Sequence, residues 1–468
     1  MDISNKKISK IYEQNTIFYK LFSTILKNYP YKKEFYSRMN KIDPQKFFDI
    51  SIKPEINVIV ITIDCLRNSQ LSSQGYQRKT TPFLDNIMYK FKTISTSPWT
   101  YPSVASILTG LYPHNHNAII KGEIKNFDNL QNFQKIKTDI LTLPEILFFL
   151  GYRIYFSTAI DMAFYPFKGR VIPRIYFSLN AETILSNLMK WISKNNSRFF
   201  AYVQLGDIHE PLNPPENFKN FFGNVKSIPN VNRWDFRNPK EYHEKNFSEY
   251  KENRIKLYDN SLRYVDHAIE QFYKYLEKKN LVDSTIFIVT ADHGEEFWEH
   301  AEVETKYFFD PRDYYGVGHG HNVFNEIIEV PLLISTPTTN MGVTKNLVSS
   351  IDITPTLLSL LDINYFGNLD GLNVFKINQD RPLLSEAIGY GFEKKSLIFG
   401  NYKLIYSKND GITWIFDLKK DPKEMFPITE DNITVQLIDK LKQIFSDSEK
   451  RKVRQVIKRK FYDGMNNK

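Results

Sequence analysis

A threonine just ahead of a predicted helix is one residue of this chain whose type and place suit catalysis. In the segment 97–110 (SPWTYPSVASILTG), Pro102 fits the first turn of a helix and Gly110 fits the position just past its end. Thr100 is therefore expected at or before the N-cap, where free backbone N–H groups and the helix dipole favour an anionic ester group. This makes Thr100 a candidate nucleophile, with simple helix capping as the alternative.

Two carboxylates each follow a strand that is predicted to be buried. Asp64 comes after the apolar run 56–63 (INVIVITI), and Asp292 ends a second β-branched run and is followed directly by His293. Open α/β sheets bind ligands at the carboxyl ends of their central parallel strands. Asp and His side chains suit a divalent transition metal, so Asp64, Thr100, Asp292 and His293 are predicted to hold one ion, although Asp64 could instead cap the next turn.

Two histidines are candidates for a second role at the same edge of the sheet. His209 follows the predicted strand 199–205, and His319 lies between two glycines that allow a close approach to a ligand. Both are candidates for acid–base catalysis. The alternative is a second metal ion, which would need a carboxylate such as Asp207 as a further ligand.

The elements that must position these residues alternate between strand and helix. Strands are predicted at 56–63, 151–156, 199–205, 284–291 and 329–334, and helices from Thr80, near 100–109, at 143–150 and at 258–279. This alternation predicts an α/β fold with a doubly wound, mostly parallel sheet that is flanked by helices. The long polar segment 212–250 is interpreted as a loop or lid near the site.

We predict four regions along the chain. They are a helical extension at 1–54, a catalytic domain at 55–345, a smaller α+β subdomain at 346–430 and a basic helical tail at 431–468. The extension carries its apolar residues at loosely helical spacing: Ile11, Phe18, Leu21, Phe22, Ile25 and Leu26. The subdomain is predicted to contain a hairpin of strands 402–407 and 413–418.

Composition narrows the function classes. The 468 residues are 42% hydrophobic, and a net charge of +9 comes from 62 basic and 53 acidic residues that are mixed along the chain. This pattern indicates a general attraction for anionic substrates, small or polymeric, rather than a nucleic-acid-binding surface. The single cysteine excludes internal disulfides, and neither a signal peptide nor a transmembrane run is evident, so a cytoplasmic location is expected.

The basic tail leaves a further partner open. It carries Lys450, Arg451, Lys452, Arg454, Lys458, Arg459 and Lys460. A solvated helix is the plainer interpretation, and peripheral contact with an anionic polymer or membrane surface is the alternative. The oligomeric state is left open.

The order of these motifs resembles the sulfatase family of the alkaline phosphatase superfamily. Asp64, then Thr100-x-Pro102-Ser103, His209-x-Pro211, the DHGE segment at 292–295 and His319-Gly320 follow one another as in that family. The similarity continues through IDITPTLL at 351–358 and the hairpin with FDLKKDP at 416–422, so it covers about residues 56–425. The resemblance implies an alkaline-phosphatase-like fold with a smaller C-terminal subdomain.

The departures from the family pattern affect the predicted chemistry. Common sulfatases have Cys-x-Pro-Ser-Arg, whose Cys becomes formylglycine, whereas this chain has Thr100 at that position and Val104 at the last one. Cys65 stands where many sulfatases have a second metal-binding Asp, and His293 stands where calcium-dependent members have an oxygen ligand. We therefore expect no formylglycine, and Mn²⁺ or Zn²⁺ rather than Ca²⁺.

Three functions are open at this point. The favoured one is a metal-dependent hydrolase that forms a covalent Thr100 intermediate, with phosphate or phosphonate esters ahead of sulfate esters because of the Thr nucleophile. The second is a phosphoethanolamine- or phosphoglycerol-type transferase that uses the same intermediate. The third is a non-catalytic binding protein on the same fold.

Overall fold

The central strand of the main sheet is buried on both faces, as its continuous apolar sequence predicts. In the computed structural model, which describes residues 30–48, 56–122, 132–176, 180–195, 197–337, 341 and 345–466, β1 spans Asn57–Ile63. It pairs in parallel with β5 (Phe199–Leu205) on one side and with β6 (Thr285–Thr290) on the other. All three strands therefore end at the same edge of the sheet.

The main sheet has eight strands in the order β10-β2-β9-β6-β1-β5-β3-β4. Its remaining strands are β2 (Tyr89–Ile94), β3 (Arg153–Thr158), β4 (Pro173–Ile175), β9 (Glu329–Ser335) and β10 (Val348–Ser349). β9 runs antiparallel to both β6 and β2, and the other pairs are parallel. The predicted doubly wound, mostly parallel sheet is thus confirmed.

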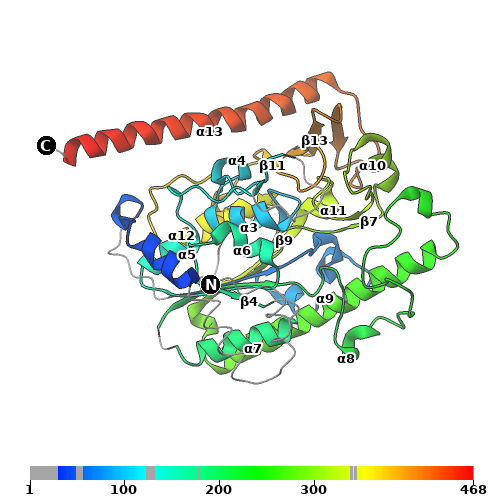
Figure 1. Cartoon of the computed structure of the whole chain (residues 1–468), viewed down its shortest axis with the longest axis horizontal. Coiled ribbons are helices and arrows are strands. Elements are labelled where there is room, and N and C mark those ends of the chain that lie inside the picture. The colour runs from blue at the N-terminus through cyan, green and yellow to red at the C-terminus, as the bar shows by residue number, and fades with distance from the viewer. Residues whose placement is uncertain are drawn as a thin grey trace, which may run out of the picture.

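Successive side chains of β1 enter two different cores, as the twofold period of a strand requires. Ile59 and Ile61 pack into a core with α7 (Ala181–Ile192) and α9 (Phe247–Lys278). Val58 and Val60 pack into the opposite core. That core contains α3 (Thr100–Thr109), α5 (Leu143–Phe149), α6 (Asp161–Phe164) and α12 (Ile353–Leu360). Figure 1 shows the sheet between these two layers of helices.

A second, antiparallel sheet follows the main one in the sequence. It consists of β11 (Leu383–Ser385), β12 (Lys395–Phe399), β13 (Tyr402–Ser407) and β14 (Ile412–Asp417). The predicted hairpin is confirmed as β13–β14, with Gly411 at φ 72° in the turn. The predicted domain boundaries stay predictions, and β10 after residue 345 still belongs to the main sheet.

The last helix, α13 (Asp431–Asn466), packs on the small sheet with its first half and extends beyond the body of the molecule in Figure 1. Leu437 and Leu441 lie in one cluster with residues of the small sheet. Arg451 pairs with Asp370 at 2.5 Å, and Lys450 pairs with Asp447 within the helix. The side chains of the other basic tail residues named above, Lys452, Arg454, Lys458, Arg459 and Lys460, lie outside the described part, and so does the extension before residue 30.

Short elements complete the fold. Residues 30–39 are helical, and α4 (Pro113–His116), α8 (Glu216–Lys219), α10 (Ala301–Tyr307) and α11 (Asn325–Ile328) are brief. β7 (Glu296–Phe297) and β8 (Val317–Gly318) form a two-stranded ribbon. In the part of the chain that is described, no helix is long and apolar enough to cross a membrane.

The prediction of a helix from Thr80 was wrong. Only a single 3-10 turn, Leu84–Asn86, forms there. The carboxylate of Asp266 on α9 accepts hydrogen bonds from the backbone N–H groups of Phe83 and Leu84, at 3.2 and 2.9 Å. These groups are thereby satisfied by a tertiary contact, and the chain turns into β2 instead of continuing as a helix.

Candidate active site

Thr100, Asp64 and His293 meet at the carboxyl edge of the main sheet. Asp64 follows β1 directly, and His293 comes three residues after the end of β6. Thr100 Oγ1 lies 3.1 Å from His293 Nε2 and 3.4 Å from Asp64 Oδ2. The structure therefore brings Asp64 and His293 together across 229 positions of the sequence. Asp292 joins them, because its Oδ2 lies 3.8 Å from His293 Nε2.

Thr100 is one position further into the helix than expected. It is the first residue of α3, and extended Trp99 takes the N-cap position without a side-chain cap. Gly110 ends the helix at φ 69°, as predicted. The first-turn residues of α3 have no intrahelical acceptor for their backbone N–H groups, and Pro102 has no N–H, so this helix end still suits the anion binding expected from the sequence.

Asp64 and Asp292 are fully buried, and their two carboxylates lie close enough to affect each other's protonation. Burial, followed by the nearby charge of Asp292, raises the pKa of Asp64 to about 8. Gln204 Nε2 donates to Asp64 Oδ2 at 2.8 Å, whereas Asp292 Oδ2 is buried without a hydrogen-bond partner. A buried carboxylate oxygen that lacks a partner is costly unless a cation faces it.

The orientation of His293 also fits a cation. Its Nδ1–H donates to the carbonyl of Gly294 at 2.9 Å, which leaves the Nε2 lone pair facing two carboxylates, with Asp64 Oδ1 at 3.3 Å. Histidines that ligate metals use their second nitrogen in this way. The donor set of Asp64, Asp292, His293 and Thr100 therefore fits a divalent transition metal.

His209 and His319 face each other at the same site. Their ring centroids are 5.2 Å apart, and the ring of His319 lies 4.2 Å from that of His293. Burial and the charge of His293 lower the pKa of His319 to about 3, so its imidazole is neutral at physiological pH. A resting proton donor would need the opposite shift, which argues against His319 as the general acid.

Glu295 is a site residue that the sequence analysis missed. It is buried, and its Oε1 accepts a hydrogen bond from His319 Nδ1 at 2.8 Å. Although burial alone would raise the pKa of Glu295, the interaction with His319, with which it shares a hydrogen bond, and the nearby His209 and Arg254 lower it. Its place two residues after His293 was a usable signal. Gln204, which donates to Asp64, is a second site residue that was missed. Its signal was that a polar residue stands within the apolar strand FFAYVQL.

Asp207 does not join the two histidines. Its Oδ1 accepts from the backbone N–H of Ala181 at the start of α7, and burial raises the pKa of Asp207 to about 7. The side chain that lies with His209 and His319 is Cys65. The structure therefore does not group Asp207 with His209 and His319 as the sequence analysis suggested, and one oxygen of its carboxylate is used at the start of α7.

Gly294 allows the close approach that places His293. A Cβ at this position would lie 2.1 Å from the carbonyl oxygen of Glu326, which is backbone and cannot rotate away. Gly294→Ala is therefore expected to lower the free energy of unfolding by about 1–3 kcal/mol, as overpacking does, and to lower activity. Denaturant titration measures the first effect. Gly75→Ala lies in open space but strains the backbone at φ 86°, so it is the control for activity alone, which it is expected to retain.

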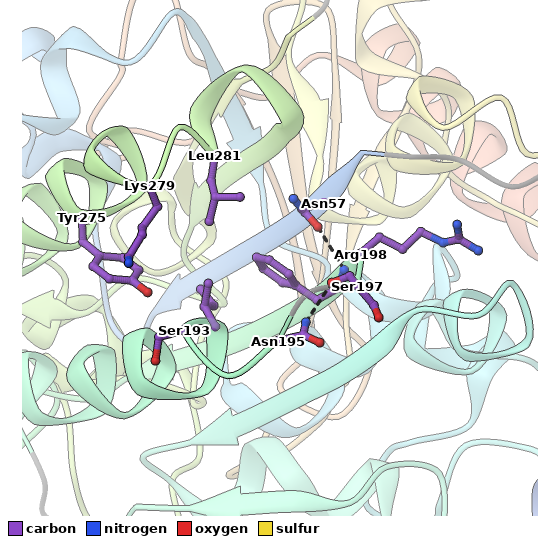
Figure 2. A pocket seen from close by; sticks show the side chains of 10 residues that line it. Asn57, Ser193, Asn195, Ser197, Arg198, Tyr275, Lys279 and Leu281 are labelled. Atoms are coloured by element: carbon purple, nitrogen blue, oxygen red, sulfur yellow. Dashed lines mark hydrogen bonds between the residues drawn. The ribbon is translucent and has the colours of Figure 1, made fainter.

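A separate pocket of about 360 Å³ lies at the opposite edge of the sheet, where β1 and β5 begin. Figure 2 shows Asn57, Ser193 and Lys279 around it, with the guanidinium of Arg198 directed away from Tyr275 and Lys279. Asn57 is already bonded to the backbone N–H of Phe199 at 3.1 Å. This pocket is remote from the strand ends that carry the candidate active site.

Comparison with known proteins decides the family. The sulfatase family model matches residues 56–363, which is more than half of the chain. The chain belongs to the sulfatase family. The C-terminal model described as N-sulphoglucosamine sulphohydrolase also matches residues 315–451 of this sulfatase. The expected family is thereby shown, and the chain is identified as a sulfuric ester hydrolase.

Relatives and solved structures of this sulfatase agree with that assignment. An arylsulfatase of Clostridium perfringens is 23% identical, over 83% of this chain and 93% of the relative. An N-acetylglucosamine-6-sulfatase of Capra hircus is 26% identical, and the match covers only 59% of this chain and 55% of that protein. The phosphonate monoester hydrolase of Agrobacterium radiobacter has a TM-score of 0.64 at 15% identity, covering 84% and 96% of the two chains. At that identity the structural likeness shows the fold alone.

Proposed function

We propose that this sulfatase hydrolyses sulfate esters of an alcohol, with Thr100 as the nucleophile and a divalent transition metal held by Asp64, Asp292 and His293. The observation that carries the proposal is the position of Thr100 Oγ1, 3.1 Å from His293 Nε2 and 3.4 Å from Asp64 Oδ2. A bound cation would lower the pKa of the Thr100 hydroxyl and polarise the ester. Mn²⁺ and Zn²⁺ suit this donor set better than Ca²⁺.

The reaction has two displacements in this proposal. Thr100 Oγ1 loses its proton to the acceptor groups beside it and attacks sulfur. The bond between sulfur and the ester oxygen breaks, and that oxygen takes one proton from His209 and leaves as the alcohol, so the number of protons in the site is unchanged. Water then attacks the Thr100 sulfate ester, which releases sulfate and restores the hydroxyl. His209 and His319 lie beside the site, and His209, rather than the neutral imidazole of His319, is assigned to protonating the leaving oxygen. The N–H groups of the first turn of α3 stabilise the equatorial oxygens.

Phosphate or phosphonate monoesters are a second candidate substrate class. The observation that favours them is Thr100 itself, because the chain has no Cys or Ser there for conversion to formylglycine. A Thr phosphoester is resolved by water in the same way as the sulfate ester. A transferase would pass the same group to an acceptor alcohol instead of water. The two relatives that match by sequence are an arylsulfatase and an N-acetylglucosamine-6-sulfatase, so sulfate is the first choice.

A panel of nitrophenyl esters tests this choice. We expect turnover of nitrophenyl sulfate by the metal-loaded protein, turnover of the phosphate and phosphonate monoesters at a different rate, and loss of both after chelation. Release of nitrophenol measures all of them on the same protein sample. A protein that binds the metal but turns over none of these esters would count against the hydrolase and favour a binding protein.

A further inference from the structure

The last helix has two halves of opposite charge. Residues 431–449 carry four acidic and two basic residues, whereas residues 450–466, here called the basic arm, carry seven basic residues and one acidic residue. The basic arm therefore contributes +6 of the net charge of +9. We propose that the basic arm binds the surface of an anionic lipid membrane. This inference is independent of the proposed function.

Contacts with the body of the protein hold α13 up to the start of the basic arm. Asn115 Nδ2 donates to Ser448 Oγ at 2.9 Å, and Arg451 Nη2 pairs with Asp370 Oδ1 at 2.5 Å. Val453, two positions further along, is 58% exposed. The helix continues from there and extends past the body in Figure 1. The basic arm is therefore presented by a helix that is anchored at its other end.

The basic arm is long enough to lie along a surface. Its 15 residues from 452 to 466 rise about 1.5 Å each, which gives about 22 Å of helix. No acidic residue stands between Glu449 and Asp463, so Arg454 and Lys458 have no carboxylate three or four positions away in the helix. Positive charge that is not balanced within its own helix favours an anionic partner, and each basic residue beside an anionic lipid surface strengthens binding about 5-fold.

Apolar residues within the basic arm favour a membrane over other anionic partners. Val453, Val456, Ile457 and Phe461 recur at the three- and four-residue spacing of one side of a helix. Helices that lie on membranes combine such residues with Lys and Arg, and the apolar residues enter the headgroup layer. A polysaccharide or a nucleic acid offers no apolar layer, and a second copy of this chain would bring a second positive arm. Seven basic residues also exclude a membrane-spanning role for this segment.

Co-sedimentation of the full chain with lipid vesicles tests the inference without any variant. We expect the protein to bind vesicles of phosphatidylcholine mixed with phosphatidylserine, and to bind vesicles of phosphatidylcholine alone at least 10-fold more weakly. Higher salt is expected to weaken the binding to the mixed vesicles, because mobile ions screen charges at a surface. Equal binding to both kinds of vesicle, or binding to neither, would overturn the inference.

Two triple variants locate the binding on the basic arm. Charge reversal at three neighbouring positions of the arm, K458E/R459E/K460E, is expected to weaken binding to the mixed vesicles at least 10-fold. The control changes the net charge equally by reversing three exposed lysines at the end of α9, K274E/K278E/K279E, and is expected to retain binding. Equal weakening in both variants would show that net charge alone attracts the protein to lipid, and would overturn the assignment to the arm.

Phe461→Ser distinguishes a membrane from an anionic polymer. It is expected to weaken binding to the mixed vesicles about 10-fold and to leave binding to heparin unchanged, because only the membrane has an apolar layer. Unchanged vesicle binding would contradict the membrane, and circular dichroism checks that each variant keeps its helix content. Ester turnover is expected to be unchanged in these variants, since the arm lies outside the candidate active site. A protein that binds lipid but turns over no ester would contradict the proposed function and leave this inference intact.

Discussion

Thr100→Ala is expected to lower kcat for ester hydrolysis by about 10⁴-fold, in line with the loss of a nucleophile in covalent catalysis. The Thr100 hydroxyl oxygen lies 3.1 Å from His293 Nε2 and 3.4 Å from Asp64 Oδ2, and the residue is 4% exposed. The substitution leaves the backbone at the start of α3 unchanged, so substrate binding is expected to change less than kcat. Steady-state kinetics with nitrophenyl sulfate measures both quantities.

Two further variants make this result specific to the nucleophile. Thr100→Ser keeps the hydroxyl and is expected to recover a large part of the lost rate, while Thr100→Val keeps the shape and is expected to stay inactive. Thr109→Val, at the far end of the same helix, removes a hydroxyl that bonds only to the Ala105 carbonyl and should keep normal turnover. Full activity in Thr100→Ala would contradict the assignment and leave the family match as evidence of fold and class alone.

Thermal stability is expected to depend on metal and pH together. The folded-state pKa of Asp64 is raised to about 8 by burial and by Asp292, from a usual value of about 3.9. A carboxyl with a raised pKa takes up a proton on folding between these two values, so the metal-free protein loses stability as the pH rises from about 4 to about 8. Metal binding replaces that proton, so the stabilisation by metal is larger at pH 8 than at pH 5.5.

The expected size of this effect is measurable by calorimetry or by thermal unfolding followed by circular dichroism. A metal at 100 times its dissociation constant stabilises the native state by about 2.7 kcal/mol. Asp64→Asn is expected to lose most of this gain and at least 10³-fold in kcat, since the cation and the hydroxyl act at one site. Asp207→Asn is the matched control, because Asp207 is also a buried carboxyl at a strand end but lies outside the cluster. An equal gain in both variants would show that the metal binds elsewhere.

Much of the sheet could be predicted from local sequence, for a plain physical reason. A strand with helices on both faces must be apolar along its whole length, and β1, β5 and β6 show this directly. The hairpin β13–β14 was equally readable, because its turn is marked by Asn409-Asp410-Gly411 between two alternating runs. β2 was missed because its sequence, YKFKTI, carries two lysines and its burial depends on β9 and β10.

The sequence by itself determined the family, through the order of motifs between residues 56 and 425. It also determined the strand ends that carry Asp64 and Asp292 and the helix at Thr100, because each of these depends on residues close together in the chain. The tertiary structure decided which polar groups share the site. Cys65, Gln204 and Glu295 join it, and Asp207 leaves it, since these outcomes depend on side-chain directions at strand ends that are up to 231 positions apart. A carboxylate that caps a helix and one that faces a cation look alike in sequence. Only the packing of the neighbouring strands and helices distinguishes them, because it fixes which lone pairs remain without a donor.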